Sequence, residues 1–108
     1  MKTTPPFDFL VPWSTIPEHK KSNFESELSK ELRPDHHLFG SHCAAVALRQ
    51  DCDDVLFQTD SDKGCLVIVH LTWIGKPDQY PDWPSTRFFD SWEDFQIREM
   101  IPENENWN

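Results

Sequence analysis

The short spacing between three apolar segments is the feature that most restricts how this chain can fold. The segments comprise residues 43–50, 55–59 and 65–73, and the turns between them, 51–54 and 60–64, are rich in Asp. Parallel strands need a crossover of about a dozen residues or more, whereas antiparallel strands need only a short turn. The three segments therefore predict an antiparallel meander.

The segment 65–73 is the strongest of these strand candidates. Its alternate residues form two largely apolar sets, Cys65, Val67, Val69, Leu71 and Trp73 against Leu66, Ile68, His70 and Thr72. A strand with two apolar faces is typically covered on both sides. We therefore expect it in the middle of the sheet, and we interpret His70 as a hydrogen-bonded core residue.

A helix is expected over residues 22–33, before the meander. Ser22 and Glu25 have the spacing of a capping box, in which each side chain satisfies a free backbone N–H of the first turn. An apolar stripe with a four-residue repeat follows, formed by Phe24, Leu28 and Leu32. Pro34 cannot continue a helix, so the pattern predicts an end near Arg33.

The C-terminal third supplies a fourth strand and a short helix. Residues 86–90 form the strand candidate, and Ser91 with Asp94 has the pattern of a helix start. Pro102 predicts the end of this helix, and a polar tail, 103–108, follows it. The fold class is thus α+β, with an antiparallel four-stranded meander sheet packed by one long N-terminal helix and one short C-terminal helix.

An apolar arm with many prolines occupies residues 1–21. Its prolines are Pro5, Pro6, Pro12 and Pro17, and its apolar residues include Phe7, Phe9, Leu10, Val11, Trp13 and Ile16. A disordered tail would be poorer in apolar side chains. We expect the arm to lie extended across the α+β body, 22–102, or across a second copy in a homodimer. The whole chain, 1–108, has the length of a single domain.

The formal net charge of −9 is concentrated outside the first third of the chain. Residues 1–34 have five basic and five acidic side chains, whereas 35–65 sum to −4 and 66–108 to −5. Nucleic-acid binding depends on Lys and Arg that neutralise phosphates, so we expect no nucleic-acid partner and no anionic membrane. A negative surface instead favours encounter with a basic protein.

The cysteine count and the N-terminus predict a cytoplasmic protein. The three cysteines, Cys43, Cys52 and Cys65, are an odd number and do not suggest a closed disulfide framework. The first residues lack the apolar run of a signal peptide. The longest strongly aliphatic run, 66–69, is far shorter than a membrane span.

The sequence has no catalytic signature, which favours a binding protein over an enzyme. It contains no G-x-S-x-G nucleophile elbow and no H-E-x-x-H helix, and its three glycines form no phosphate-binding loop. A cluster of metal-ligand residue types is nevertheless present: His36, His37, His42 and Cys43. Zinc takes three or four such ligands. Adjacent histidines on an extended segment point to opposite sides, so we interpret this segment as a polar loop and expect no cofactor. Zinc is the alternative if these residues do converge on one ion.

The two Asp-rich turns are a weaker candidate for a site. Paired carboxylates can bind Mg²⁺ or Ca²⁺. Asp is also a preferred turn residue, because its side chain bonds its own backbone. The second turn departs from a calcium loop, since Gly64 falls one position early and Leu71 stands where Glu is required. We therefore interpret both groups as turns that could form an acidic docking patch.

The long loop before residue 86 has the composition of a recognition surface. It joins three aromatic residues, Trp73, Tyr80 and Trp83, with two acidic ones, Asp78 and Asp82, and prolines stiffen it. Trp and Tyr are enriched in binding hot spots, and long ordered loops are often functional. The alternative is that these aromatic residues cap the core.

Three functional hypotheses follow from the sequence. The leading one is a small acidic protein-binding module, for example an immunity or antitoxin-like inhibitor of a basic protein, which uses the five loop residues named above. The second is a metal-binding protein or metal-dependent enzyme built on the His36, His37, His42 and Cys43 cluster. The third is a structural protein that self-associates through its N-terminal arm.

Overall fold

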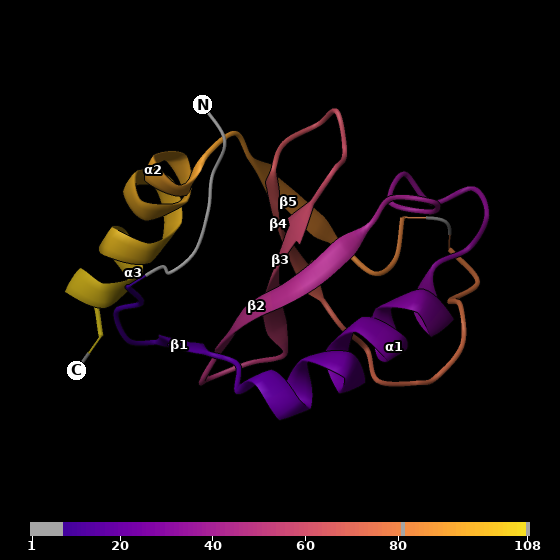
Figure 1. Cartoon of the computed structure of the whole chain (residues 1–108), viewed down its shortest axis with the longest axis horizontal. Coiled ribbons are helices and arrows are strands. Elements are labelled where there is room, and N and C mark those ends of the chain that lie inside the picture. The colour runs from indigo at the N-terminus through magenta and orange to yellow at the C-terminus, as the bar shows by residue number, and fades with distance from the viewer. Residues whose placement is uncertain (1–7, 81, 108) are drawn as a thin grey trace.

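A five-stranded antiparallel sheet with helices on both faces forms the protein (Figure 1). The computed structural model describes residues 8–80 and 82–107. Its elements are, in order, β1 (Trp13–Thr15), the 3-10 helix η1 (Glu18–Lys20), α1 (Lys21–Glu31), β2 (Cys43–Arg49), β3 (Asp54–Thr59), β4 (Leu66–His70), β5 (Thr86–Phe89), α2 (Trp92–Phe95), the π-helical segment η2 (Gln96–Met100) and α3 (Ile101–Glu105). The strands lie in sequence order, β1-β2-β3-β4-β5, so the predicted antiparallel meander is confirmed.

The sheet has five strands, and the prediction of four was wrong. The additional strand is β1, which lies within the expected arm and pairs antiparallel with β2, with Trp13 opposite Arg49 and Thr15 opposite Ala47. Pro12 and Pro17 flank this strand, and proline is tolerated at the edge of a sheet because no further strand needs its N–H. A strand of three residues is too short to show an alternating pattern in the sequence.

The N-terminal helix is shifted and does not have the expected capping box. η1 leads directly into α1, and Lys20 at the cap position makes no side-chain capping bond. Glu25 instead accepts a hydrogen bond from the backbone N–H of Ala45 in β2, at 2.8 Å. The helix ends at Glu31, and Leu32 is already extended, ahead of Pro34 as predicted.

The C-terminal helix begins where predicted but does not end at Pro102. Ser91 Oγ accepts a hydrogen bond from the backbone N–H of Asp94, at 3.1 Å. Helical structure then continues through η2 and α3 to Glu105. Pro102 lies in the first turn of α3, directly after the wider π turn, where its missing N–H is tolerated. Residues 103–105, expected in the polar tail, therefore belong to this helix.

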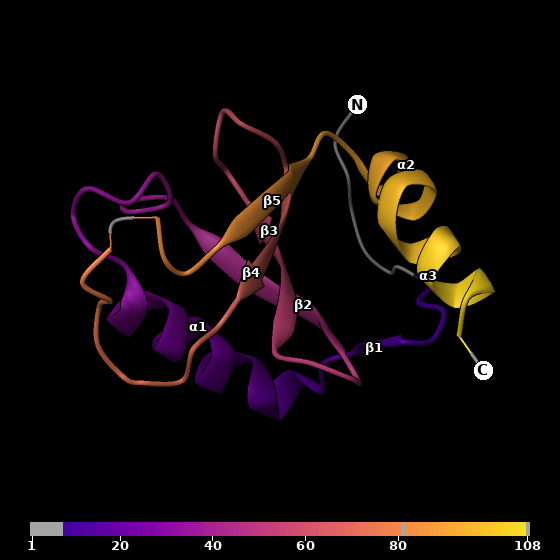
Figure 2. The same cartoon turned by 180° about the vertical axis from the view of Figure 1, so that it is seen from behind.

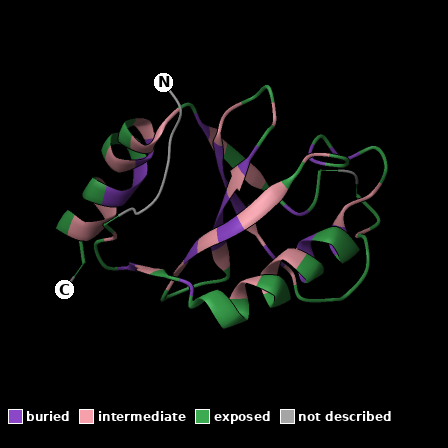
Figure 3. Cartoon of the chain, in the orientation of Figure 1, coloured by how far each residue is buried: buried purple, intermediate pink, exposed green. Residues whose placement is uncertain are grey.

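The sheet separates two apolar clusters. In Figures 1 and 2, α1 and the C-terminal helical segment lie on opposite sides of the sheet. The cluster toward α1 contains Ile16, Leu28, Leu38, Ala45, Val55, Phe57, Val67, Val69 and Leu71. The cluster toward the C-terminal helices contains Trp13, Ala47, Leu56, Leu66, Ile68, Phe89, Phe95 and Met100. Both faces of β4 are thus covered, as its sequence predicted, and buried residues concentrate in the sheet (Figure 3).

In the described part of the chain, no helix is long and apolar enough to cross a membrane.

Candidate binding surface

Two buried carboxylates on α1 hold the start of the loop that joins β4 to β5. We call residues 72–85 the aromatic loop. Glu31, only 1% exposed, accepts hydrogen bonds from the Thr72 backbone N–H at 3.0 Å, the Thr72 hydroxyl at 2.9 Å and the Trp73 backbone N–H at 2.8 Å. Glu27, also buried, accepts one from the Gly75 backbone N–H at 2.9 Å. The first turn of the loop is therefore fixed by side chains of a neighbouring helix.

The two carboxyl groups of Glu27 and Glu31 also influence each other. They lie four residues apart, on the same side of α1. Burial raises the pKa of Glu31, and a hydrogen bond with Glu31 lowers the pKa of Glu27. The pair therefore releases its two protons at different pH values, with Glu31 retaining its proton longer. Neither carboxylate has a basic side chain as its main partner: backbone N–H groups of the loop stabilise Glu31, and Glu31 itself is the main partner of Glu27.

Trp73 has a backbone conformation that these carboxylates help to maintain. Its φ is 59°, a region that bulky residues adopt only when surrounding contacts impose it. The bond from its N–H to Glu31 fixes the peptide, and its ring packs edge-on against Phe24 with 5.6 Å between ring centroids. Trp73 remains exposed beyond this contact. The loop thus begins with a tryptophan held against α1.

The later part of the aromatic loop is attached to the segment after α1. Arg33 donates hydrogen bonds to the backbone carbonyls of Asp78 at 3.3 Å and Gln79 at 2.7 Å. His36, which is buried, forms a 2.9 Å hydrogen bond through Nε2 with the Pro84 carbonyl. The loop is therefore attached to the rest of the protein both at its start and near its end. Its largest apolar side chains still face solvent, namely Trp73, Ile74, Tyr80 and Trp83.

The five predicted loop residues do not form one continuous patch. Trp73 lies over α1, beside Lys20 and Lys30, in a pocket of about 540 Å³. Trp83 lines a different pocket, of about 490 Å³, on the sheet face that the C-terminal helices cover only in part. Tyr80 is the most exposed of the three aromatic residues, at 58%. The carboxylate of Asp78 accepts a hydrogen bond from the Tyr80 N–H at 3.1 Å, and Asp82 is exposed.

Three of the four predicted metal ligands, His36, His37 and Cys43, have side chains that contact other parts of the protein. His36 and His37 do not point apart, because turns place their ring centroids 4.4 Å from each other. His36 Nδ1 accepts from the Leu38 N–H, and His37 Nε2 lies 2.6 Å from the Thr86 hydroxyl. Burial is the main cause that lowers the pKa of His37.

The remaining two ligand candidates also contact other groups of the protein. The Cys43 thiol contacts the Thr59 hydroxyl at 3.5 Å, and burial raises its pKa. His42 is held by its backbone N–H, which bonds Asp60. Among residues 8–80 and 82–107, no group of three or more His, Cys, Asp and Glu side chains is placed to hold a metal ion.

An Asp–His pair that was not expected from the sequence lies in the pocket beside Trp83. Asp54 and His70 are direct partners across β3 and β4, and Asp54 Oδ1 lies 2.8 Å from His70 Nδ1. The side chain of His70 is 43% exposed, so the interpretation of a core histidine was wrong. β4 ends at His70, beyond the residues covered by the C-terminal helices. The sequence does contain a signal for this pair. If the turn between the two strands is centred on residue 62, residue 59 lies opposite 65, and residue 54 then lies opposite 70.

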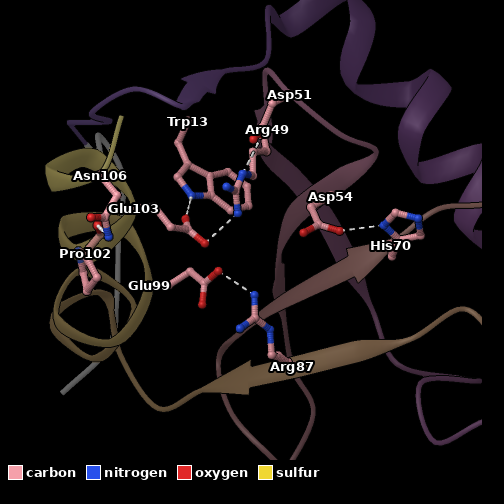
Figure 4. A network of polar contacts seen from close by, with 10 residues as sticks. All are labelled: Trp13, Arg49, Asp51, Asp54, His70, Arg87, Glu99, Pro102, Glu103 and Asn106. Carbon is pink, nitrogen blue, oxygen red and sulfur yellow. Dashed lines mark hydrogen bonds and ion pairs between the residues drawn. The ribbon is translucent and has the colours of Figure 1, made fainter. Parts of the chain in front are cut away.

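A network of charged side chains extends from this pocket toward the C-terminal helices (Figure 4). Arg87 forms an ion pair with Glu99, a buried carboxylate on η2. Glu103 accepts hydrogen bonds from the Trp13 indole N–H and from Arg49, both at 2.7 Å. The network joins β1, β2 and β5 to the helix that covers them.

Glu103 has the most strongly shifted pKa of this network. Burial raises the pKa of Glu103 to about 7, and the neighbouring Glu99 carboxyl adds to the shift. The hydrogen bond from Trp13 and the positive charge of Arg49 act in the opposite direction and only partly offset it. The folded protein therefore holds this proton more tightly than an unfolded chain, in which the pKa is near 4.5.

The raised pKa of Glu103 predicts that its contribution to stability is lost as the pH rises. This contribution is complete below about pH 4.5 and disappears as the pH increases through about 7. Between about pH 5 and pH 8, the free energy of unfolding should fall by about 2 kcal/mol less in Glu103→Gln than in the wild type. Urea denaturation at each pH measures the difference between variant and wild type.

The comparison of variant with wild type isolates Glu103 from the other shifted groups. The raised pKa of Glu31 gives a slope of the same sign, and the lowered pKa of His37 gives the opposite sign at acidic pH, but both remain in the variant. Glu105→Gln, an exposed change on the same helix, is the control and should follow the wild type. Identical pH profiles for wild type and Glu103→Gln would contradict the prediction.

Comparison with known proteins identifies no relative: no family model, no curated protein and no solved structure matches this chain. A function for this protein must therefore be inferred from the geometry of its candidate binding surface.

Proposed function

We propose that this protein is a protein-binding module that docks on a basic partner through its aromatic loop. The observation that carries the proposal is the attachment of the loop to Glu27, Glu31 and Arg33 while Tyr80 and Trp83 remain exposed. A loop that is ordered before binding loses less conformational entropy in the complex. Exposed Trp and Tyr side chains on such a loop are the residue types most often found in hot spots.

The charge of the protein supports a basic partner. The net charge is −9, and two arginines near the loop and the pocket are already paired with carboxylates. Arg33 is engaged by Asp35 and by loop carbonyls, and Arg87 is engaged by Glu99. The positive charges of Arg33 and Arg87 are therefore matched by carboxylates and do not offset the negative field of the protein. Such a field steers a cationic partner toward the surface and raises the association rate.

An inhibitor of a basic enzyme is one concrete form of this function. An immunity or antitoxin-like protein needs a preformed surface, because it must bind its target quickly and tightly. The fixed aromatic loop on an acidic body fits that requirement. The partner's surface should carry Lys and Arg around an apolar centre that receives Trp83 and Tyr80.

Replacing Trp83 by alanine should weaken partner binding by at least about 2 kcal/mol, or roughly 30-fold, because an exposed hot-spot aromatic ring is lost. The partner is first isolated by affinity capture with the tagged protein at moderate salt, and the affinity is then measured by titration calorimetry. Trp107→Ala is the matched control, since Trp107 is a similarly exposed tryptophan outside the loop. Equal affinities for Trp83→Ala and the wild type would exclude Trp83 as a contact residue.

A further inference from the structure

The pocket beside the Asp54–His70 pair has the chemistry of a cation site. It has a volume of about 490 Å³ and is lined by Asp54, Ile68, His70, Trp83, Ser85, Thr86 and Arg87. We propose that this pocket binds the guanidinium group of an arginine side chain presented by the basic partner. This arginine site rests on the proposed docking function and gives it a specific anchor.

The Asp54–His70 pair supplies two hydrogen-bond acceptors. His70 Nδ1 lies 2.8 Å from Asp54 Oδ1, and a carboxylate is satisfied there by the tautomer that carries its proton on Nδ1. His70 Nε2 is then an acceptor, directed away from Asp54. The carboxylate uses Oδ1 for His70, so Oδ2 can accept from a ligand. A ligand with several N–H donors suits this arrangement, whereas an anion does not.

The walls of the pocket favour a flat cation. Trp83 is 40% exposed, and its indole ring can stack on a guanidinium group. Ile68 is buried beneath and provides an apolar floor. A guanidinium group has five N–H donors in one plane, which can bond both acceptors while its face contacts Trp83. A lysine ammonium would offer charge without this planar contact.

Arg87 does not cancel the negative charge of the pocket. Its guanidinium is paired with Glu99, which is buried and provides a matching negative charge (Figure 4). The charges of Asp54, Arg87 and Glu99 therefore sum to one negative charge. This charge belongs to Asp54, at the position where the cation would bind.

The test is a titration with the tripeptide acetyl-Gly-Arg-Gly-amide, followed by the NMR signals of the Ser85 and Thr86 backbone amides, which line the pocket. We expect saturable shifts with a Kd of about 1 mM, since a single anchor residue contributes only part of an interface. The same peptide with citrulline, which is uncharged, should not bind. The same peptide with lysine should bind at least about threefold more weakly.

Two variants locate the binding to this pocket. Asp54→Asn and Trp83→Ala should each weaken arginine-peptide binding, the first by at least about tenfold. Asp62→Asn is the matched control, because it removes the same charge from an exposed turn. Amide signals remote from the pocket report whether each variant keeps the fold. If Asp54→Asn does not fold, Trp83→Ala still tests the site.

The outcomes separate the arginine site from the docking proposal. No saturable shift up to about 10 mM peptide, or equal binding of the arginine, lysine and citrulline peptides, would overturn the arginine site. If Trp83→Ala still weakened the affinity for the intact partner, docking through the loop would stand without this anchor. Conversely, arginine-specific binding lost in Asp54→Asn supports the site even if the intact partner binds elsewhere.

Discussion

Trp13→Ala should lower the free energy of unfolding by about 4 kcal/mol, because it removes a large aromatic side chain from the core. Trp13 is 1% exposed although it belongs to a strand of only three residues. Its ring packs edge-on against Phe95, with ring centroids 5.3 Å apart, and its indole N–H bonds Glu103. The substitution therefore leaves a large cavity and removes a contact between β1 and the C-terminal helix.

Urea denaturation of three variants separates the contributions of Trp13. Trp107→Ala is the control for loss of a tryptophan and should cost less than about 1 kcal/mol, because Trp107 is 37% exposed. Trp13→Phe retains much of the buried ring but loses the bond to Glu103, so its loss of stability should be intermediate. A loss for Trp13→Ala no greater than for Trp107→Ala would show that β1 does not dock as described.

Glu31→Ala should have the second largest effect, lowering the free energy of unfolding by about 3 kcal/mol. Its carboxylate accepts three hydrogen bonds from Thr72 and Trp73, and the side chain is buried. Without it, these donors lose their partner and the positive φ of Trp73 loses its support. Urea denaturation measures the loss, and hydrogen exchange of the Trp73 amide reports whether the loop itself opens.

The control for Glu31→Ala is Glu18→Ala, because Glu18 has an exposed side chain paired with Lys21 at the surface. It should change the stability by less than about 0.5 kcal/mol. Of the two variants, only Glu31→Ala should show faster hydrogen exchange of the Trp73 amide than the wild type. If the Trp73 amide stayed as protected as in the wild type, Glu31 would not be what fixes the loop, and the main support for the docking proposal would be removed.

Turn lengths made the sheet predictable, whereas tertiary contacts decided the features that were missed. Short Asp-rich turns required antiparallel pairing of β2, β3 and β4, and the structure has it. The capping-box prediction failed because the Glu25 carboxylate bonds the Ala45 N–H of β2 instead of its own helix. No local pattern could show that bond, because it arises only when α1 packs against the sheet.

The candidate site was likewise predictable only in part. Its residue types, aromatic and acidic, were visible in the loop sequence, but the sequence could not show that Trp73 and Trp83 line different pockets. The carboxylates that fix the loop are two helical residues that look like an ordinary solvated helix face. The pocket at His70 depends on the register between β3 and β4, which follows from the turn only if its centre is known.

The contact between Trp13 and the C-terminal helix has a consequence for how the chain acquires its structure during synthesis. Trp13 leaves the ribosome well before its partners Phe95 and Glu103, which lie more than three-quarters of the chain further on. Until they emerge, the apolar sheet face around Leu56 and Ile68 has no cover. We therefore expect nascent chains that stop before α2 to be bound by chaperones, and chains that extend past α3 to be released from them.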